Sequence, residues 1–288
     1  MAQTFSSLLS SISSLKIQGA NNVALAGLDA LGMAVKTARS KKELTKKINQ
    51  IVNTRPTEPL LRNIINYCEH QLDYSHLLSS YISARKNTRF FFEEGKNKII
   101  SYGKNKIPNN AIIYTHCHSS TVVQIIIKAK KKVKAVNNTE TRPLFQGRMT
   151  AKDVAKAGIP VEHYVDSAAR IALKGAHLVL LGADAITVDG VYNKVGSEMI
   201  AVLAKHFKIP LYVCAHSWKY DNQAEFGFEE TIEKRHAKEV WSRPPKNVHI
   251  NNYAFERIDF ELITGIITEL GILPPTLFLE EIKRKYGF

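Results

Sequence analysis

The pattern of apolar and polar positions changes character at about residue 108. Before it, apolar residues recur at three-to-four spacing with long Lys-rich polar faces, and strand-like runs are few. This period is typical of amphipathic helices. We expect the helices to break near residues 36–42, at the turn 53–57, and near residues 102–110, where Gly, Pro and Asn cluster. The pattern predicts an N-terminal helical domain over residues 1–108.

Short apolar runs alternate with helical segments from Ala111 onward. The runs read AIIYT, VKAVN, IPVEHYV, HLVLLGAD and IPLYVCA, and they carry few charges. Strands of this kind are covered on both faces, as in a parallel sheet with crossover helices. The fold class is therefore expected to be α/β, with a Rossmann-like parallel-sheet domain over residues 109–288.

The C-terminal third contains less regular segments. Residues 224–246 are charged and end in Arg243-Pro244-Pro245, which suggests a helix followed by a surface excursion. Residues 248–250, residues 262–264 and a helix from Thr276 are expected to close the fold.

Composition narrows the class of protein. A chain of 288 residues with 44% hydrophobic content can fill a core. No stretch approaches the roughly 20 apolar residues of a membrane span, and the N-terminus lacks the features of a signal peptide. A cytoplasmic location is expected, with no membrane partner. The three cysteines are widely spaced and should be free thiols.

The chain is strongly basic. Its net charge is +14, which favours anionic partners such as phosphorylated metabolites, nucleic acid or acidic proteins. The densest run, residues 128–134, is best interpreted as a solvated helix end with cations near the C-terminal dipole. Nucleic acid is not expected as a partner, because no interleaved aromatic residues or duplex-reading motif accompany the basic residues.

The loop after the first strand carries the candidate chemistry. It reads Thr-His-Cys-His-Ser-Ser-Thr over residues 115–121 and leads into an apolar helix. Amides and hydroxyls at a helix N-terminus bind anions, and the same partial positive charge lowers the pKa of a nearby thiol. We therefore expect Ser119, Ser120 and Thr121 to cradle a phosphate and Cys117 to be a thiolate, although a buried inert cysteine is the commoner alternative. The flanking histidines supply too few ligands for a metal, so neither metal nor cofactor is expected.

Other candidates follow the remaining strands. Asp184 ends the fourth strand ahead of a short hairpin, and Lys194 could reach a phosphate just before the dipole of the next helix. The alternatives, a helix-capping Asp and a surface Lys, stay open. Further polar, small or cationic residues near helix entrances or strand ends complete the set: Gln18, Gly19, Ala20, Asn21, Arg55, Asn193 and Lys219.

Taken together, these segments resemble one superfamily. THCHS, TETRPLFQGRMTA, DSAAR, GADAITVDG, NKVGS and SWKY occur in the same order as in the proteins that comprise ribose-1,5-bisphosphate isomerase, methylthioribose-1-phosphate isomerase and the α, β and δ subunits of the exchange factor for translation initiation factor two. The resemblance extends from KIQGA through TRPT to ITELGILPP. Its branch most similar to this chain is the archaeal ribose-1,5-bisphosphate isomerases.

The resemblance implies an activity and site roles. Members of that branch convert ribose 1,5-bisphosphate to ribulose 1,5-bisphosphate in nucleotide salvage, and their catalytic Cys and Asp correspond to Cys117 and Asp184. We expect Cys117 to take the C2 proton and Asp184 to assist ring opening and proton return. The substrate would be held by residues 18–21, Arg55, Ser119, Ser120, Thr121, Asn193, Lys194 and Lys219. The resemblance further implies a homo-oligomer, either a hexamer built as a trimer of dimers or a dimer, and a nucleotide activator such as AMP.

Two departures and two rival functions accompany the resemblance. Glu256 stands where the family usually has Asp, and the first motif lacks the Arg often found beside its glycine. One rival is a non-catalytic regulatory subunit that binds nucleotide or sugar phosphate, although that branch typically lacks the Cys and Asp. The other is methylthioribose-1-phosphate isomerase, which normally has Arg where this chain has Ala185.

Overall fold

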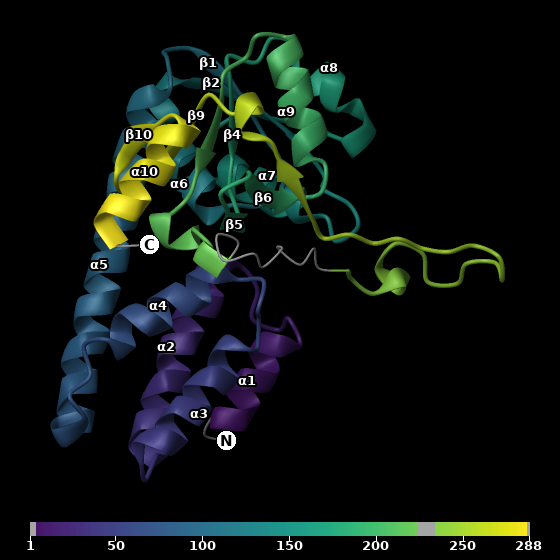
Figure 1. Ribbon diagram of the computed structural model, residues 1–288. Coiled ribbons are helices and arrows are strands. Elements are labelled where there is room, and N and C mark those ends of the chain that lie inside the picture. The colour runs from purple at the N-terminus through teal and green to yellow at the C-terminus, as the bar shows by residue number, and fades with distance from the viewer. Residues whose placement is uncertain (1–3, 224–233, 287–288) are drawn as a thin grey trace. The chain divides into compact units, whose positions relative to one another are not determined.

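A computed structural model describes residues 4–223 and 234–286, and its contacts separate the chain into two compact units (Figure 1). The helical unit comprises the residues up to Glu94 together with Trp218–Asp221, and the sheet unit comprises Gly95–Ser217 and the residues from Asn222 onward. The expected domain boundary at residue 108 falls just after helix α5 (Leu77–Lys106), which contributes residues to both units. That boundary stays a prediction.

The helical unit is built from amphipathic helices, as the period of its apolar residues predicts. Besides the first part of α5, its helices are α1 (Phe5–Ser13), α2 (Ala20–Thr37), α3 (Lys41–Val52) and α4 (Pro59–Glu69). The predicted breaks at residues 36–42 and 53–57 are confirmed. Thr4 caps α1 and Ser40 caps α3 through side-chain oxygens that accept first-turn N–H groups, which is why these helices begin where they do.

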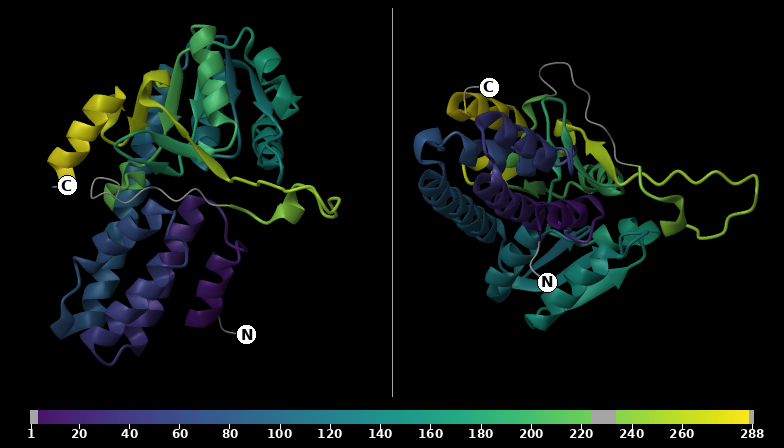
Figure 2. Two further views of the ribbon diagram at one scale, coloured as in Figure 1. Left: turned by 45° about the vertical axis from the view of Figure 1, so that its right-hand side comes forward. Right: turned by 90° about the horizontal axis from the view of Figure 1, so that it is seen from below.

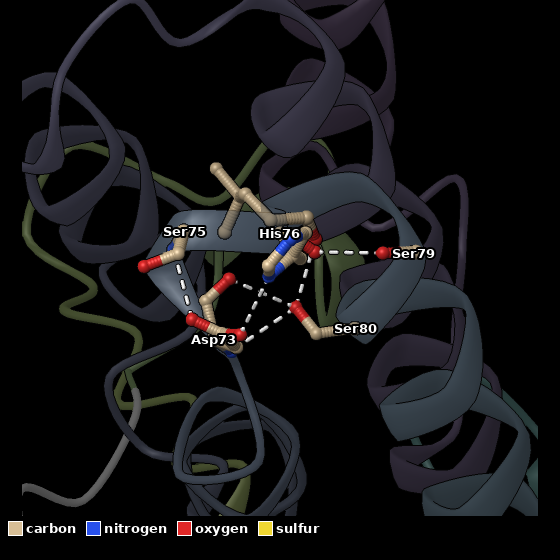
Figure 3. A network of polar contacts seen from close by, with 6 residues as sticks. Asp73, Ser75, His76, Ser79 and Ser80 are labelled. Atoms are coloured by element: carbon tan, nitrogen blue, oxygen red, sulfur yellow. Dashed lines mark hydrogen bonds and ion pairs between the residues drawn. The ribbon is translucent and has the colours of Figure 1, made fainter.

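A polar network sets the start of the region that leads into α5 (Figure 3). The Asp73 carboxylate accepts the backbone N–H of Ser75 at 2.8 Å and lies 3.1 Å from the His76 ring. The Ser80 hydroxyl donates to the Asp73 carbonyl, and the Asp73 N–H donates back to Ser80. These bonds occupy backbone groups that a helix start leaves unpaired.

Helix α4 anchors the distant segment Trp218–Asp221 within the helical unit. The Asn63 amide donates to the carbonyls of Trp218 (2.7 Å) and Tyr220 (2.8 Å). Arg62 pairs with the buried Asp221 at 2.6 Å. The Trp218 ring packs against the aromatic rings of Tyr67, Phe91 and Phe92, with centroids 4.8, 5.0 and 6.2 Å away.

The sheet unit contains a seven-stranded sheet in the order β10-β9-β7-β4-β1-β2-β3 (Figures 1 and 2). Its strands are β1 (Ala111–Thr115), β2 (Val133–Thr139), β3 (Val161–Tyr164), β4 (Leu178–Leu181), β7 (Leu211–Cys214), β9 (Gly265–Thr268) and β10 (Gly271–Leu273). All neighbouring strands pair in parallel except β10 with β9. The predicted α/β class, with helices followed by a Rossmann-like parallel sheet, is confirmed.

Helices and a small second sheet complete this unit. The helices are α6 (Ser120–Lys128), α7 (Gln146–Lys156), α8 (Ala169–Leu173), α9 (Ser197–His206) and α10 (Pro275–Tyr286). The small antiparallel sheet has the order β5 (Ala185–Ile186), β6 (Val191–Lys194) and β8 (Phe255–Ile258). The predicted hairpin around residues 187–190 is thus present as the β5–β6 turn. Among residues 4–223 and 234–286, no helix has both the length and the apolar character needed to cross a bilayer.

The C-terminal third differs from the prediction in detail. Residues 224–233 of the expected helix lie outside the described residues, and residues 234–246 contain only the short turn Ala237–Glu239. Residues 248–250 form no strand, and the last parallel strand begins at Gly265, just after the predicted segment 262–264. Paired prolines and a dense run of charges leave residues 234–250 without an apolar face to bury, which accounts for their irregular backbone.

Candidate functional site

Cys117 and Asp184 follow the two strands between which the direction of the sheet reverses. From β1 the chain proceeds outward through β2 and β3, whereas the later strands β4, β7 and β9 continue on the other side of β1. Cys117 comes just after β1, and Asp184 comes just after its neighbour β4. In doubly wound sheets, the crevice beyond the carboxyl ends of such a strand pair is where ligands bind.

A glycine allows these two strand ends to approach closely. A Cβ atom on Gly182 would lie 2.8 Å from the Ser119 Cβ, a separation that real Cβ atoms do not reach. The bare backbone after β4 therefore lies against the N-terminus of α6, where Ser119 is the N-cap. Asp184 is two residues farther along the chain, so the close contact brings its loop beside the loop that carries Cys117.

Two threonine hydroxyls hold the Cys117 backbone in an unusual conformation. Its φ of 62° lies in the left-handed region, which non-glycine residues adopt only when their surroundings impose it. The Thr141 hydroxyl oxygen accepts the Cys117 N–H at 2.9 Å, and the Thr150 hydroxyl donates to the Cys117 carbonyl at 2.8 Å. The N–H and the carbonyl of Cys117 are thus both held by hydrogen bonds, which is typical of a residue whose functional side chain must be positioned rigidly.

Burial raises the pKa of the Cys117 thiol to about 12, and the negative charge of Asp184 adds to the shift. The positive charge of Lys194 lowers the pKa of the thiol, but this effect is smaller than those of burial and Asp184. This shift opposes the prediction that the α6 N-terminus makes Cys117 a thiolate, because burial and a nearby carboxylate both disfavour the charged form of the thiol.

Lys194 lies on β6 and shares an electrostatic environment with both residues. Its side chain is buried, burial lowers its pKa, and the charges of Cys117 and Asp184 raise it again. The Asn193 amide donates to the Ser197 hydroxyl at 2.9 Å, and that hydroxyl donates to the Lys194 carbonyl at 2.6 Å. The sheet unit thus brings together Cys117, Asp184 and Lys194, as the resemblance implies.

The two helix N-termini of this region differ in what occupies them. At α9, the Glu256 carboxylate accepts the backbone N–H groups of Gly196 and Glu198. The idea that Lys194 meets a phosphate at the α9 dipole therefore conflicts with a protein carboxylate that already binds there. At α6, Ser119 caps the helix through the Val122 N–H, and the other predicted cradle residues, Ser120 and Thr121, form its first turn.

The remaining predicted site residues belong to the helical unit. Residues 18–21 surround the start of α2, where the N-cap Gly19 has a φ of 83° and no side-chain cap. Arg55 precedes α4 and is only 9% exposed, and its guanidinium lies 3.2 Å from the Glu58 carboxylate. Lys219 stands within the segment that α4 anchors.

Several residues that shape this region were not predicted from the sequence as site residues. They are Thr141, Thr150, His116 and Glu256. The two threonine hydroxyls hold the Cys117 backbone, and Glu256 was noted only as a departure from the family pattern. The partners in these contacts lie 23 to 79 residues away along the chain, so local patterns carry no signal for them. Within the described ranges, no three His, Cys, Asp or Glu side chains are grouped to hold a metal ion.

Comparisons with known proteins identify relatives of this chain. The sequence model of the Initiation factor 2 subunit family matches residues 16–275. Ribose 1,5-bisphosphate isomerase of Pyrococcus furiosus is 33% identical, with 96% of this chain and 92% of that protein covered. Methylthioribose-1-phosphate isomerase of Dehalococcoides mccartyi is 32% identical, with 91% and 87% covered.

Solved structures show the same fold. A crystal structure of the translation initiation factor eIF-2B of Pyrococcus horikoshii OT3 superposes with a TM-score of 0.83 at 26% identity, covering 96% of this chain and 98% of that one. Because the family model spans most of the sequence and the relatives align over nearly their full length, the chain belongs to the Initiation factor 2 subunit family.

Proposed function

We propose that this chain is an aldose–ketose isomerase that converts ribose 1,5-bisphosphate to ribulose 1,5-bisphosphate. The observation that carries the proposal is the pairing of Cys117 with Asp184 at the strand reversal, in a chain whose relatives named ribose 1,5-bisphosphate isomerase are up to 33% identical. Two negatively charged phosphates on the substrate also suit a chain with a net charge of +14.

The pair would share one working proton. In the free protein this proton resides on Cys117, because burial and the charge of Asp184 raise the pKa of the thiol. Passing it to Asp184 gives a thiolate base and a carboxylic acid, the two groups that the reaction needs. Lys194 favours the thiolate through its positive charge. Catalysis would then depend on substrate binding to shift the proton within the pair.

The steps balance with this pair alone. Asp184 donates a proton to the ring oxygen as the bond from C1 to that oxygen breaks. The Cys117 thiolate removes the C2 proton, and the electron pair of the C–H bond forms the C1–C2 double bond of an enediol-type intermediate. C1 then receives a proton from the pair while the C2 hydroxyl loses one to it. The product is the C2 ketone, and the pair returns to its starting protonation.

Binding roles are also proposed for the other residues that the resemblance implies. In the sheet unit, the α6 N-terminus with Ser119, Ser120 and Thr121, together with Asn193 and Lys194, would hold one part of the substrate. For the residues of the helical unit, a substrate-binding role rests on the resemblance alone; they are Gln18, Gly19, Ala20, Asn21, Arg55 and Lys219. Arg55 offers a planar fork suited to phosphate oxygens, and its present partner Glu58 would have to share it.

A cytoplasmic role in nucleotide salvage, assembly as a hexamer or dimer and activation by a nucleotide such as AMP complete the proposal. They rest on the resemblance to the archaeal isomerases. Sedimentation of the purified chain, with and without AMP, would test the assembly and the nucleotide effect together.

Methylthioribose-1-phosphate isomerase is the second candidate, because relatives with that name are 31–32% identical. The substrates of the two candidates differ at one position, where ribose 1,5-bisphosphate has its second phosphate and methylthioribose 1-phosphate has a methylthio group. Lys219 follows the fifth parallel strand that the sequence predicts, and a cation suits a phosphate better than a methylthio group. The bisphosphate is therefore preferred.

Turnover of each substrate by the wild-type protein and by Cys117→Ser tests the function. We expect the wild type to form ribulose 1,5-bisphosphate without added metal and the variant to lose activity by several orders of magnitude while its circular dichroism stays unchanged. Turnover of methylthioribose 1-phosphate alone would favour the second candidate. A wild type inert toward both substrates would indicate a regulatory subunit.

A further inference from the structure

His116 is a buried histidine beside Cys117 whose two ring nitrogens are both engaged. It is 3% exposed. Its Nδ1 lies 2.7 Å from the Thr139 hydroxyl, and its Nε2 lies 3.0 Å from the Val195 carbonyl oxygen. The first contact reaches the end of β2, and the second reaches the loop between β6 and α9. The ring thus connects three parts of the sheet unit.

The partners of the ring determine where its proton lies. A carbonyl oxygen only accepts, so Nε2 must carry the hydrogen that Val195 receives. The neutral ring then has Nδ1 as an acceptor, and the Thr139 hydroxyl donates to it. The Tyr114 hydroxyl, 3.3 Å away, can donate to Thr139 in turn. Burial also lowers the pKa of His116, in agreement with a neutral ring.

The loop that His116 contacts begins directly after Lys194, the last residue of β6. Gly196, with a φ of 102°, passes so close that a Cβ there would lie 3.1 Å from the His116 Nε2. On its other side the loop is held by Glu256, which accepts the Gly196 N–H at 2.8 Å. The loop is therefore fixed between β8 on one side and the residue that precedes Cys117 on the other.

We propose that His116 is a positioning residue, a fixed neutral hydrogen-bond donor that holds the Val195 carbonyl and thereby keeps Lys194 beside Cys117. This role rests on the proposed function, in which Cys117 must become a thiolate. His116 itself transfers no proton. Its contribution is to keep the cation that favours the thiolate in place.

The charges around Cys117 give the role a measurable consequence. Lys194 lowers the pKa of the thiol, whereas Asp184 and, more weakly, Asp166 raise it. If the Val195 contact is lost, the loop that follows Lys194 is released on one side, and the charge of Lys194 offsets the two carboxylates less. The pKa of Cys117 then rises further, and the fraction of thiolate at a given pH falls about tenfold for each unit.

Alkylation of Cys117 by iodoacetamide over a range of pH measures this fraction directly. Peptide mass spectrometry separates Cys117 from the buried thiols Cys68 and Cys214. We expect His116→Phe, which keeps a flat buried ring but has no donor, to be alkylated several-fold more slowly, with its pH profile shifted upward. His116→Gln, whose amide can donate to Val195, should recover part of the rate. His163→Gln, on β3, is the matched control and should behave like the wild type.

Thr139→Val is a second variant that tests the positioning role of His116. It removes the closer of two hydroxyls at Nδ1 and leaves only the Thr141 hydroxyl, 3.4 Å away, so the ring is held less firmly. Thr139→Val should therefore also slow alkylation, even if His116→Phe does not fold. Wild-type alkylation profiles in folded Thr139→Val and His116→Phe would overturn the proposal. Alkylation needs no substrate, so a chain inert toward ribose 1,5-bisphosphate would refute the proposed function without deciding this test.

Discussion

The Glu256 carboxylate lies 2.8 Å from the backbone nitrogen of Gly196 and accepts its hydrogen bond. The contact joins β8 to the start of α9, so the small sheet and a crossover helix of the large sheet are fixed to each other. A protein carboxylate here does for the helix what a bound anion would do. The loop that follows Lys194 is therefore held in place without substrate.

The stability that Glu256 confers should depend on pH. Burial raises its pKa above the ordinary value of 4.5. A raised folded-state pKa means that the contribution is fully present below pH 4.5 and is lost as the pH rises through the folded-state value. Glu256→Gln does not titrate. The difference in free energy of unfolding, wild type minus variant, should therefore fall as the pH rises through this window. Urea unfolding at a series of pH values measures it, and a difference that stays level or grows would contradict the prediction.

Asp184→Asn should make the Cys117 thiol more reactive while abolishing turnover. The variant removes the negative charge that raises the pKa of Cys117, so the pKa should fall toward the value that burial alone sets. Alkylation of Cys117 near neutral pH should be several-fold faster than in the wild type. If the rate is unchanged or slower, the two side chains do not interact as described, and the shared-proton mechanism fails with them.

Asn63→Ala should destabilise the helical unit. The substitution leaves the Trp218 and Tyr220 carbonyls without the amide that bonds both of them, which costs about 1–3 kcal/mol of unfolding free energy. If Lys219 binds substrate phosphate, KM should also rise while kcat changes less. Asn66→Ala, an exposed position on the same helix, is the control and should change neither quantity. An Asn63→Ala protein with wild-type stability would show that α4 does not anchor the segment.

Gly147→Ala and Gly158→Ala should differ sharply. A Cβ at Gly147 would lie 1.8 Å from the Thr139 carbonyl oxygen, so the backbone of α7 or β2 must move. Nothing lies within 4 Å of a Cβ at Gly158, whose φ of 81° imposes only conformational strain of about 1–2 kcal/mol. Thermal unfolding should show a much lower Tm for Gly147→Ala. Similar Tm values for the two variants would mean that the α7–β2 contact adapts easily.

The sequence predicted the sheet well because its information is local. The parallel strands β1, β2, β3, β4 and β7 were each visible in the sequence as a short apolar run, whereas β9 was missed. The alternation of these runs with helices implied that Cys117 and Asp184 would meet at one edge. The pKa of Cys117 could not be predicted in the same way, since it depends on burial by the whole sheet and on charges from other strands. His116 was considered only as a metal ligand, because its bond to Val195 spans 79 residues.

The membership of Trp218 in the helical unit bears on how the chain is made. Tyr67, Phe91 and Phe92 are synthesised early, yet the indole that packs against them emerges from the ribosome more than a hundred residues later. Until then Arg62 also lacks its partner Asp221. Domains generally fold in order of synthesis. Here the first unit to be translated cannot complete its packing until most of the second has been translated, so the nascent helices expose an aromatic surface for which a chaperone would compete.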